Sequence, residues 1–239
     1  MSDGRKPEIS IVVPTLNEEK RLEDALESLR SQFTSKTYEI IVADGYSEDK
    51  TVEIAESLAD KVVFEKKRTI SAGRQAGARA AEGKVIVSAG ADIYVGPHWL
   101  DSLTKPIFNK THVASIGPVV PSDGNLAEEL FAHGFLKPTA HFLSKLGVHH
   151  AIADNMAIDA DVFKRTGGFN PDLVTCEDLD LIARAKAHGK IAFVPEAHAY
   201  VSMRRVREWG YPKYLHFHTT NFLKYHFKGK PNEKYEPVR

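Results

Sequence analysis

The amino-acid sequence predicts an α/β protein: a single domain with a mostly parallel central sheet flanked by helices. The first observation is that short β-branched runs alternate along residues 9–88 with stretches whose apolar residues recur at helical spacing. Strands that alternate with helices are joined by right-handed crossovers and form parallel sheets. The second is that polar or glycine-bearing segments follow three of the strands, at residues 14–18, 44–47 and 89–92. Ligands of parallel sheets bind beyond the carboxyl ends of the strands, so these segments predict one crevice.

The elements can be placed in order along the chain. We expect strands over residues 9–13, 39–43, 62–64 and 85–88, and helices over 17–29, 52–58 and 70–81. Pro14 is expected to end the first strand. Beyond Trp99 the alternation breaks down. The elements expected there are a helix end and a strand within 107–118, a helical stretch over 125–146 interrupted at Pro138, a strand over 155–158, helices over 160–165 and 179–188, a strand over 191–194, and a last helix over 209–228 with Pro212 in its first turn.

The composition is that of an ordinary globular protein. Of 239 residues, 42% are hydrophobic and 27% are charged, and 32 basic residues balance 32 acidic ones, which argues against a nucleic-acid-binding protein. The single cysteine, Cys176, excludes an internal disulfide and a cysteine metal cluster and fits a reducing compartment. No apolar run reaches the roughly 20 residues of a membrane span, and the N-terminal residues lack the apolar core of a signal peptide. These features predict a cytoplasmic protein.

An acidic segment near residue 177 is the most informative local feature. Glu177 and Asp178 stand between the turn at Gly167-Gly168 and an apolar run with helical spacing. The first turn of a helix has unpaired N–H groups and a positive dipole end, which favour ionised carboxylates. An ionised carboxylate at the rim of an α/β sheet can act as a general base. The alternative interpretation is an acidic helix N-terminus without a catalytic role.

Several segments, in their order and spacing, resemble the family 2 glycosyltransferases, which have the GT-A fold. The resemblance covers roughly residues 8–205 and leaves 206–239 as a C-terminal helical extension. The matching segments are Val13-Pro14-Thr15-Leu16-Asn17-Glu18-Glu19, Ile41-Val42-Ala43-Asp44-Gly45-Tyr46-Ser47 with Asp49 and Thr51, Gly73-Arg74-Gln75-Ala76-Gly77, Gly90-Ala91-Asp92, Gly168-Phe169, and Glu177-Asp178-Leu179-Asp180-Leu181-Ile182-Ala183-Arg184.

This resemblance implies a binding site for a nucleotide-sugar donor. Its substrate-binding residues would be Pro14, Thr15, Asn17, Glu18, Asp44, Gly45, Arg74, Ala91, Glu177 and Arg204. A carboxylate such as Asp44 can accept the imide N–H of uracil, which a cytosine or adenine edge cannot offer in the same way. A UDP-sugar is therefore the favoured donor, and a GDP-sugar is the other possibility. The guanidinium of Arg74 offers a planar fork of donors to base or phosphate oxygens. Without the resemblance, Asp44 could equally be a turn residue and Arg74 part of a solvated helix face.

The resemblance also implies a divalent cation, Mg²⁺ or Mn²⁺, bound by Asp92. Gly90-Ala91-Asp92 stands where the family usually has Asp-x-Asp, so the first carboxylate is missing. Mg²⁺ uses few protein carboxylates together with phosphates and waters, so one can suffice. Val201 stands where the family often has a histidine, and His198 is out of register. The remaining histidines, among them His149, His150, His216 and His218, lack a recognisable ligand spacing and are expected to be surface or packed residues.

The function that the resemblance implies is inverting glycosyl transfer from a nucleotide-diphosphate sugar to a hydroxyl or a lipid phosphate. Asp178 would be the general base, and Glu177 would contact the acceptor or orient the site. Arg204 and Arg205 would hold the diphosphate, unless they are a basic pair on the surface. One alternative is a non-catalytic nucleotide-sugar-binding relative, for which Gly90 argues. Another is a nucleotidyltransferase, which would need a basic, glycine-rich loop after the first strand, where this chain has the acidic segment 16–19.

The last helix raises the question of the acceptor. Its aromatic and aliphatic residues lie close to one face, and its lysines supply positive charge; they are Tyr211, Tyr214, Leu215, Phe222 and Tyr225, and Lys213, Lys224, Lys228 and Lys230. Rings beside lysines suit a membrane interface, in which case the protein would lie peripherally on the inner face of the membrane and the acceptor would be lipid-linked. Otherwise this face packs on the catalytic domain, and a soluble glycan is the better acceptor.

Overall fold

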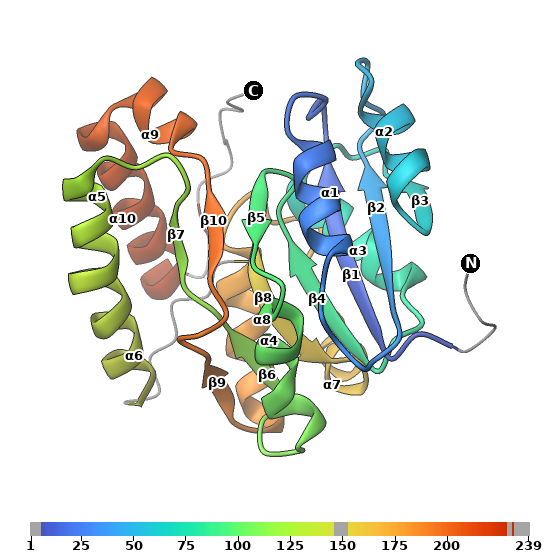
Figure 1. Ribbon diagram of the computed structural model, residues 1–239. Coiled ribbons are helices and arrows are strands. Elements are labelled where there is room, and N and C mark those ends of the chain that lie inside the picture. The colour runs from blue at the N-terminus through green and yellow to red at the C-terminus, as the bar shows by residue number, and fades with distance from the viewer. Residues whose placement is uncertain (1–5, 146–152, 229–230, 232–239) are drawn as a thin grey trace.

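The computed structural model describes residues 6–145, 153–228 and 231, and it is an α/β fold built on a seven-stranded sheet (Figure 1). The strand order is β3-β2-β1-β4-β8-β6-β9. The strands are β1 (Ile9–Thr15), β2 (Tyr38–Asp44), β3 (Lys61–Phe64), β4 (Val85–Ala89), β6 (Ala114–Ile116), β8 (Asn155–Asp159) and β9 (Ile191–Phe193). All neighbouring pairs are parallel except the two that β8 makes, with β4 and β6. The predicted α/β class with a mostly parallel sheet is confirmed.

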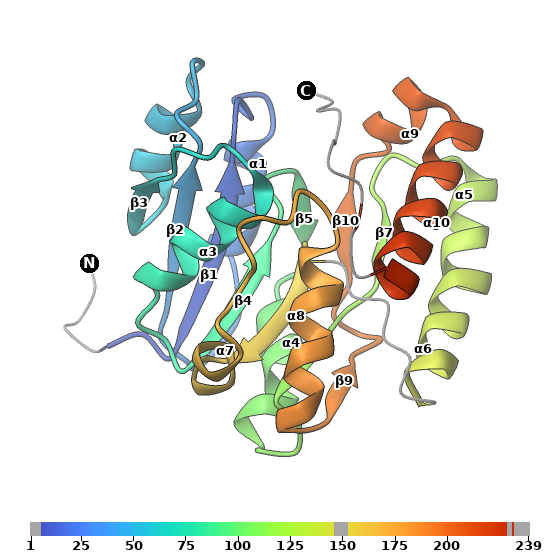
Figure 2. The same cartoon turned by 180° about the vertical axis from the view of Figure 1, so that it is seen from behind.

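Helices cover both faces of this sheet. One face carries α1 (Leu22–Arg30), α2 (Thr51–Leu58) and α4 (Trp99–Phe108), as seen in Figure 1. The other carries α3 (Ile70–Ala80), α7 (Ala160–Thr166) and α8 (Glu177–Ala185), which face the viewer in Figure 2. Each face has its own apolar core, because the β-branched strand residues alternate between the two. Ile11 and Val13 pack with α1 and α4, whereas Val12 packs with α3 and α7.

A second, smaller sheet and a helical layer lie beyond the β9 side. The small sheet has the order β5-β10-β7, with β5 (Ile93–Val95), β7 (Val119–Pro121) and β10 (Ala199–Val201). The sequence did not predict it, because three-residue strands carry too few side chains to show a period. The outer layer contains α5 (Leu126–Phe131), the π-helical turn η1 (Ala132–Leu136), α6 (Lys137–Lys145), α9 (Arg204–Trp209) and α10 (Tyr211–Lys228) (Figure 1).

Two expectations about prolines need correction. Pro14 does not end β1, which continues to Thr15 in register with β2. The pairing of β1 with β4 stops at Val12, so the missing N–H of Pro14 leaves no gap in a ladder on that side. The helical stretch over 125–146 is not interrupted at Pro138. The irregular turn is η1, which directly precedes α6, and Pro138 lies in the first turn of α6.

The last helix begins close to its expected start. Gly210, with a φ of 75°, separates α9 from α10, and Pro212 lies in the first turn of α10 as expected. Within the described residues, no helix combines the length and the apolarity needed to cross a membrane. His149 and His150, Leu146, and Lys230 lie outside the described residues.

Candidate active site

The loops after β1 and β2 form a rigid rim at the carboxyl edge of the sheet. Asp44 is fully buried, and its carboxylate accepts hydrogen bonds from the Thr15 hydroxyl (2.9 Å), the Ser47 hydroxyl (2.6 Å) and the Ser47 N–H (2.7 Å). The Gly45 N–H donates to the Thr15 carbonyl (2.9 Å). Asp44 is therefore more than a turn residue, because it joins two strand ends from beneath the crevice.

Asn17 and Pro14 complete this rim. Asn17 has a φ of 55°, its N–H donates to the Ser47 hydroxyl (2.8 Å), and its side-chain oxygen accepts from the Glu48 N–H (2.8 Å). Pro14 lies against α3, where a Cβ on Gly73 would come within 3.1 Å of the Pro14 Cβ. The four predicted residues Pro14, Thr15, Asn17 and Asp44 are thus brought together at one edge.

Arg74 lies at the centre of a buried polar cluster. Its Nε donates to the Ser88 hydroxyl (3.0 Å), its Nη2 to Asp154 Oδ1 (2.6 Å), and its Nη1 to Glu177 Oε1. Burial works against the charge of Arg74, but Asp154 and Glu177 more than offset it and hold its pKa above the usual value. Arg74 is therefore not on a solvated helix face, and it connects α3 with β4, β8 and α8.

Glu177 and Asp178 open helix α8, as the sequence predicted, with Cys176 before them at a φ of 61°. Glu177 is buried, and burial raises its pKa to about 7, while Arg74 opposes the shift and Asp178 adds to it. Asp178 Oδ2 accepts a hydrogen bond from the Ala153 N–H (3.0 Å). This bond fixes Asp178 next to Asp154, at the point where β8 begins.

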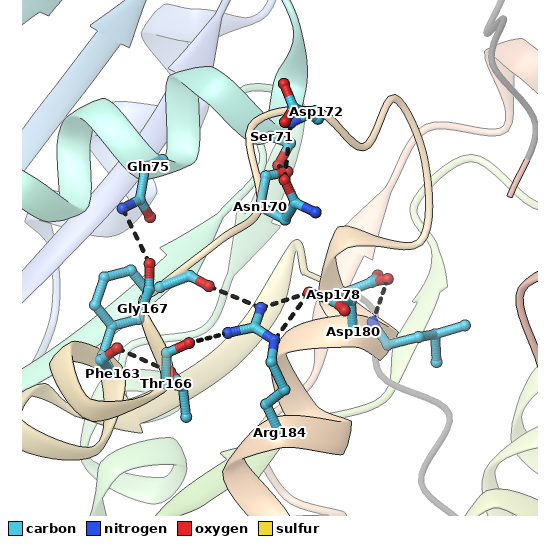
Figure 3. Close-up of polar contacts among 12 residues, drawn as sticks. Ser71, Gln75, Phe163, Thr166, Gly167, Asn170, Asp172, Asp178, Asp180 and Arg184 are labelled. Carbon is cyan, nitrogen blue, oxygen red and sulfur yellow. Dashed lines mark hydrogen bonds and ion pairs between the residues drawn. The ribbon is translucent and has the colours of Figure 1, made fainter. Parts of the chain in front are cut away.

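The start of α8 is anchored by the glycine turn before it (Figure 3). Arg184, one turn further along α8, ion-pairs with Asp180 and donates to the carbonyls of Thr166 and Gly168 (2.8 Å to Gly168). Gly168 has a φ of 76°, and a Cβ there would lie 2.7 Å from the Phe163 ring, so only glycine fits. On the α3 side, the Ser71 hydroxyl donates to the Asn170 carbonyl (2.6 Å). Asp180 therefore serves to orient the helix, as part of this anchor.

Asp92 and Arg204 meet at the other side of the crevice. Arg204 Nη2 lies 3.0 Å from Asp92 Oδ2 and 3.0 Å from Glu18 Oε1. Burial raises the pKa of Asp92, the charge of Asp154 raises it further, and Arg204 opposes both. Glu18, Asp92 and Arg204 are thus brought together from three distant parts of the sequence, and Ala91 is buried beside them.

The Asp92 carboxylate fits a cation that is shared with substrate phosphates. Its side chain is 24% exposed, so an oxygen can be reached from the crevice. Among the residues described, no group of three or more His, Cys, Asp or Glu side chains is arranged to hold a metal alone. His198 is turned elsewhere, since its Nε2 lies 2.8 Å from Lys137 Nζ. A site with few protein ligands is the arrangement that Mg²⁺ and Mn²⁺ use with diphosphates.

A groove of about 830 Å³ also borders Asp92, on the α1 side. It runs between α1 and the small sheet, past Phe33, Tyr94 and Tyr200. Among the described residues, its lining includes neither Arg74 nor the carboxylates of α8, so it adjoins the polar cluster without containing it.

Helix α10 covers the start of α8. Thr175 Oγ1 donates to Asn221 Oδ1 (3.1 Å), Asn221 Nδ2 lies 3.2 Å from the Cys176 sulfur, and the Tyr225 hydroxyl donates to Asp180 Oδ1 (3.1 Å). The predicted apolar face of this helix is therefore divided. Tyr214, Phe222 and Tyr225 are partly buried, whereas Tyr211 and Leu215 are exposed.

Sequence reasoning missed Asp154. It ion-pairs with Arg74, its charge affects the pKa of both Asp92 and Glu177, and it lies beside Asp178. The only available signal was an acidic residue directly before the strand expected at 155–158. That signal is weak, because the antiparallel insertion of β8 next to β4 is what brings Asp154 to the crevice.

Known proteins are similar to this chain in sequence and in fold. Residues 10–167 match the family described as Glycosyl transferase family 2. Glycosyltransferase AglE of Haloferax volcanii is 25% identical over 218 residues, which cover 85% of this chain and 69% of that protein. A dolichol-phosphate mannosyltransferase of Pyrococcus furiosus is 30% identical over 111 residues, 44% of this chain and 32% of that protein. The structure of mannosyltransferase PcManGT from Pyrobaculum calidifontis, with GDP-Man and Mn²⁺, matches with a TM-score of 0.73 at 21% identity over 96% of this chain and 67% of that chain.

The chain belongs to glycosyl transferase family 2, and its fold is the GT-A fold. The family match runs from β1 to the glycine turn after α7. The matched segment makes up only 32% of the Pyrococcus relative.

Proposed function

We propose that this chain is an inverting glycosyltransferase that moves a sugar from a nucleotide-diphosphate donor to a hydroxyl or lipid-phosphate acceptor, with Asp178 as general base. The observation that carries the proposal is the continuity of the polar cluster. Asp178 is bonded to Ala153, the neighbouring Asp154 contacts Arg74 and lies against Gly90, and Asp92 follows two residues later. The proposed base, Asp178, and the proposed cation-binding carboxylate, Asp92, are thus connected through one set of polar contacts, which supports a displacement at an anomeric carbon.

The proposed step is a single displacement. Asp178 takes the proton of the acceptor hydroxyl as its oxygen forms a bond to the anomeric carbon. The bond between that carbon and the diphosphate oxygen breaks, and the electron pair leaves with the nucleotide diphosphate. Arg204, which ion-pairs with Asp92, would hold the leaving diphosphate if Asp92 bound a cation in its place. The cation, Mg²⁺ or Mn²⁺, would neutralise charge on the leaving group.

A phosphate acceptor needs no base, because its oxygen is already ionised at neutral pH. The role of Asp178 therefore distinguishes the two acceptor classes. With a hydroxyl acceptor, Asp178→Asn should lower the transfer rate by about 10²-fold or more. With a polyprenyl phosphate, the same variant should keep most of its activity.

The experiment is a transfer assay with UDP- and GDP-sugars, in Mn²⁺ or Mg²⁺ and in EDTA, on the parental chain and two variants. Asp101→Asn is the matched control for Asp178→Asn, because Asp101 is an exposed aspartate in the first turn of α4. Loss of transfer in EDTA and its return with Mn²⁺ would support the cation. Nucleotide-sugar binding without transfer to any acceptor would favour a non-catalytic relative, and transfer of the nucleotide itself would favour a nucleotidyltransferase.

The donor base is tested through Asp44. We propose a UDP-sugar first, because a carboxylate can accept the uracil imide N–H, and a GDP-sugar second. Because the proposed contact is with the base, Asp44→Asn should weaken affinity for the free nucleotide as well as for its sugar conjugate. Calorimetric titration of UDP, GDP and their sugar conjugates measures these affinities. Equal affinity of parental and variant chains for both nucleotides would remove Asp44 from the site.

For the acceptor, we propose peripheral contact with a membrane through the outer helical layer. Helices α5, α6 and α10 lie side by side in both views, and the Tyr211 hydroxyl bonds to Glu128 across them (Figures 1 and 2). Their exposed apolar side chains are Leu126, Leu130, Phe142, Tyr211, Leu215, Leu223 and Phe227. A surface of this kind flanked by lysines suits an anionic bilayer.

Liposome flotation tests this contact. The parental chain should float with anionic vesicles at low salt, and Leu215→Glu combined with Phe227→Glu should abolish flotation. Phe33→Glu is the control, because Phe33 is 66% exposed but lies on the loop after α1. A parental chain that does not float with any lipid mixture would leave a soluble acceptor as the proposal.

A further inference from the structure

The glycine at position 90 is not required by its backbone. Gly90 does not have a positive φ, so an L side chain meets no conformational penalty there. What restricts the position is the neighbouring side chain. A Cβ built on Gly90 would lie 3.0 Å from Asp154 Oδ1 and 3.1 Å from Asp154 Cγ. The carboxylate of Asp154 thus lies against the space into which a side chain at position 90 would extend.

Resting on the proposed donor site, we propose that Asp154 supplies the second carboxylate for its divalent cation, in place of a carboxylate at position 90. The ligand pair would then be Asp92, between β4 and β5, and Asp154, at the start of β8. Because β8 runs antiparallel to β4, with Asn155 in register with Ala89, its first residues reach the crevice from the opposite direction.

Both carboxylates are arranged so that a cation can reach them. Asp154 Oδ1 is held by Arg74 and Asp92 Oδ2 by Arg204, each through a single oxygen. A carboxylate has two oxygens and about four lone-pair positions, so each retains capacity for a metal bond. Their side chains are 35% and 24% exposed, respectively, in contrast to the buried Glu177.

The charges of the pair explain why a cation would bind between them. Two ionised carboxylates that border the same site repel each other. A divalent cation bound by both would remove that repulsion. Asp154 is also not the only residue that positions Arg74, because Ser88 and Glu177 already bind the other two guanidinium nitrogens.

The test is Mn²⁺ binding to the full chain, measured by electron paramagnetic resonance of free Mn²⁺ with and without UDP or GDP. Asp154→Asn keeps an oxygen that can accept from Arg74 but removes the charge. We expect it to weaken Mn²⁺ binding about tenfold or more. If Asp154 only positions Arg74, this variant will bind Mn²⁺ with parental affinity, and the inference is wrong.

Moving the carboxylate from position 154 to position 90 tests whether the two side chains would occupy the same space. Gly90→Asp alone places two carboxylates in one space and should weaken Mn²⁺ binding or lower the melting temperature. The double variant Gly90→Asp with Asp154→Gly should regain the affinity that Asp154→Asn loses. If the double variant folds but does not regain Mn²⁺ binding, the inference that Asp154 replaces a carboxylate at position 90 is wrong.

These outcomes are separable from the proposed function. A parental chain that transfers sugar in EDTA and binds no Mn²⁺ would overturn this inference and leave the transferase in place. A parental chain that binds Mn²⁺ through Asp154 but transfers no sugar from any donor would support the inference and overturn the proposed function.

Discussion

The two sides of the crevice are built in different ways. The proposed donor side, residues 9–89, consists of consecutive strand–helix units in which β3, β2, β1 and β4 are neighbours. The proposed reaction side, the described residues from 90 to 228, contains the antiparallel β8, the small sheet and α10. Polar contacts between distant residues hold it together. Sequence periodicity specifies the first kind of region, whereas the second depends on individual side chains.

Asn155 illustrates the second kind. Its fully buried amide accepts from the Trp99 indole (2.9 Å) and donates to the carbonyls of Pro118 (2.9 Å) and Ala197 (2.7 Å). One side chain thus joins α4 to the segments leading into the small sheet. No local sequence pattern predicts such a residue. Loss of the Asn155 side chain would leave several buried polar groups without a hydrogen bond.

The largest predicted effect comes from Arg74, which joins the two sides. Arg74→Met removes the partner of the buried Glu177 and of Asp154, so the free energy of unfolding at pH 8 should fall by about 3–5 kcal/mol. Denaturant unfolding followed by circular dichroism measures it. Arg68→Met is the control, because its ion pair with Glu48 is exposed, and such pairs contribute about 0–1 kcal/mol. Similar losses for the two variants would mean that Arg74 does not join the two sides.

The same comparison explains what the sequence predicts. The sheet class, the strands and helices up to residue 89, and the acidic start of α8 follow from apolar periodicity and from helix-end chemistry, and the structure contains them. The ion pairs of Asp92 with Arg204 and of Arg74 with Asp154 join residues 80 or more positions apart. Both depend on how β8 and β10 enter the fold. Asp154 was therefore not among the predicted site residues, although Asp92 and Arg204 were.

Glycines whose missing Cβ leaves room for a neighbouring segment provide a second comparison between the two sides. A Cβ on Gly117 would lie 2.1 Å from the Ala197 carbonyl oxygen, whereas one on Gly77 would lie 2.4 Å from a methyl group of Val12. A side chain can shift more easily than a buried backbone carbonyl. Gly117→Ala should therefore destabilise the protein by about 1–3 kcal/mol, and Gly77→Ala by less. Gly96→Ala, with no heavy atom within 4 Å, is the control, and thermal unfolding ranks the three. The reverse order would show that the reaction side adapts more readily.

The pH dependence of stability gives a smaller effect. Because burial raises the pKa of Glu177 from 4.5 to about 7, the folded state holds a proton that the unfolded state releases between these values. The stabilisation from this proton is complete below pH 4.5 and is lost as the pH rises through 7. From pH 5 to pH 8 the parental chain should lose about 2 kcal/mol more than Glu177→Gln, which cannot titrate. Parallel pH profiles of the two proteins would mean that Glu177 stays ionised throughout.

The smallest effect concerns the docking of α10, and Cys176 reports it. This thiol is the only one in the chain, and burial, reinforced by Asp178 and Glu177, raises its pKa to about 12. Alkylation by iodoacetamide at pH 8 should therefore be slow, since the thiolate is the reactive form. Asn221→Ala removes the side chain that joins α10 to Thr175 and Cys176, at a cost of about 1 kcal/mol. Alkylation should then accelerate about fivefold, if opening of α10 is what exposes the sulfur. Thr219→Ala, at an exposed position on the same helix, should leave the rate unchanged. Equal rates for Asn221→Ala and the parental chain would mean that the thiol becomes accessible by a route that does not involve α10.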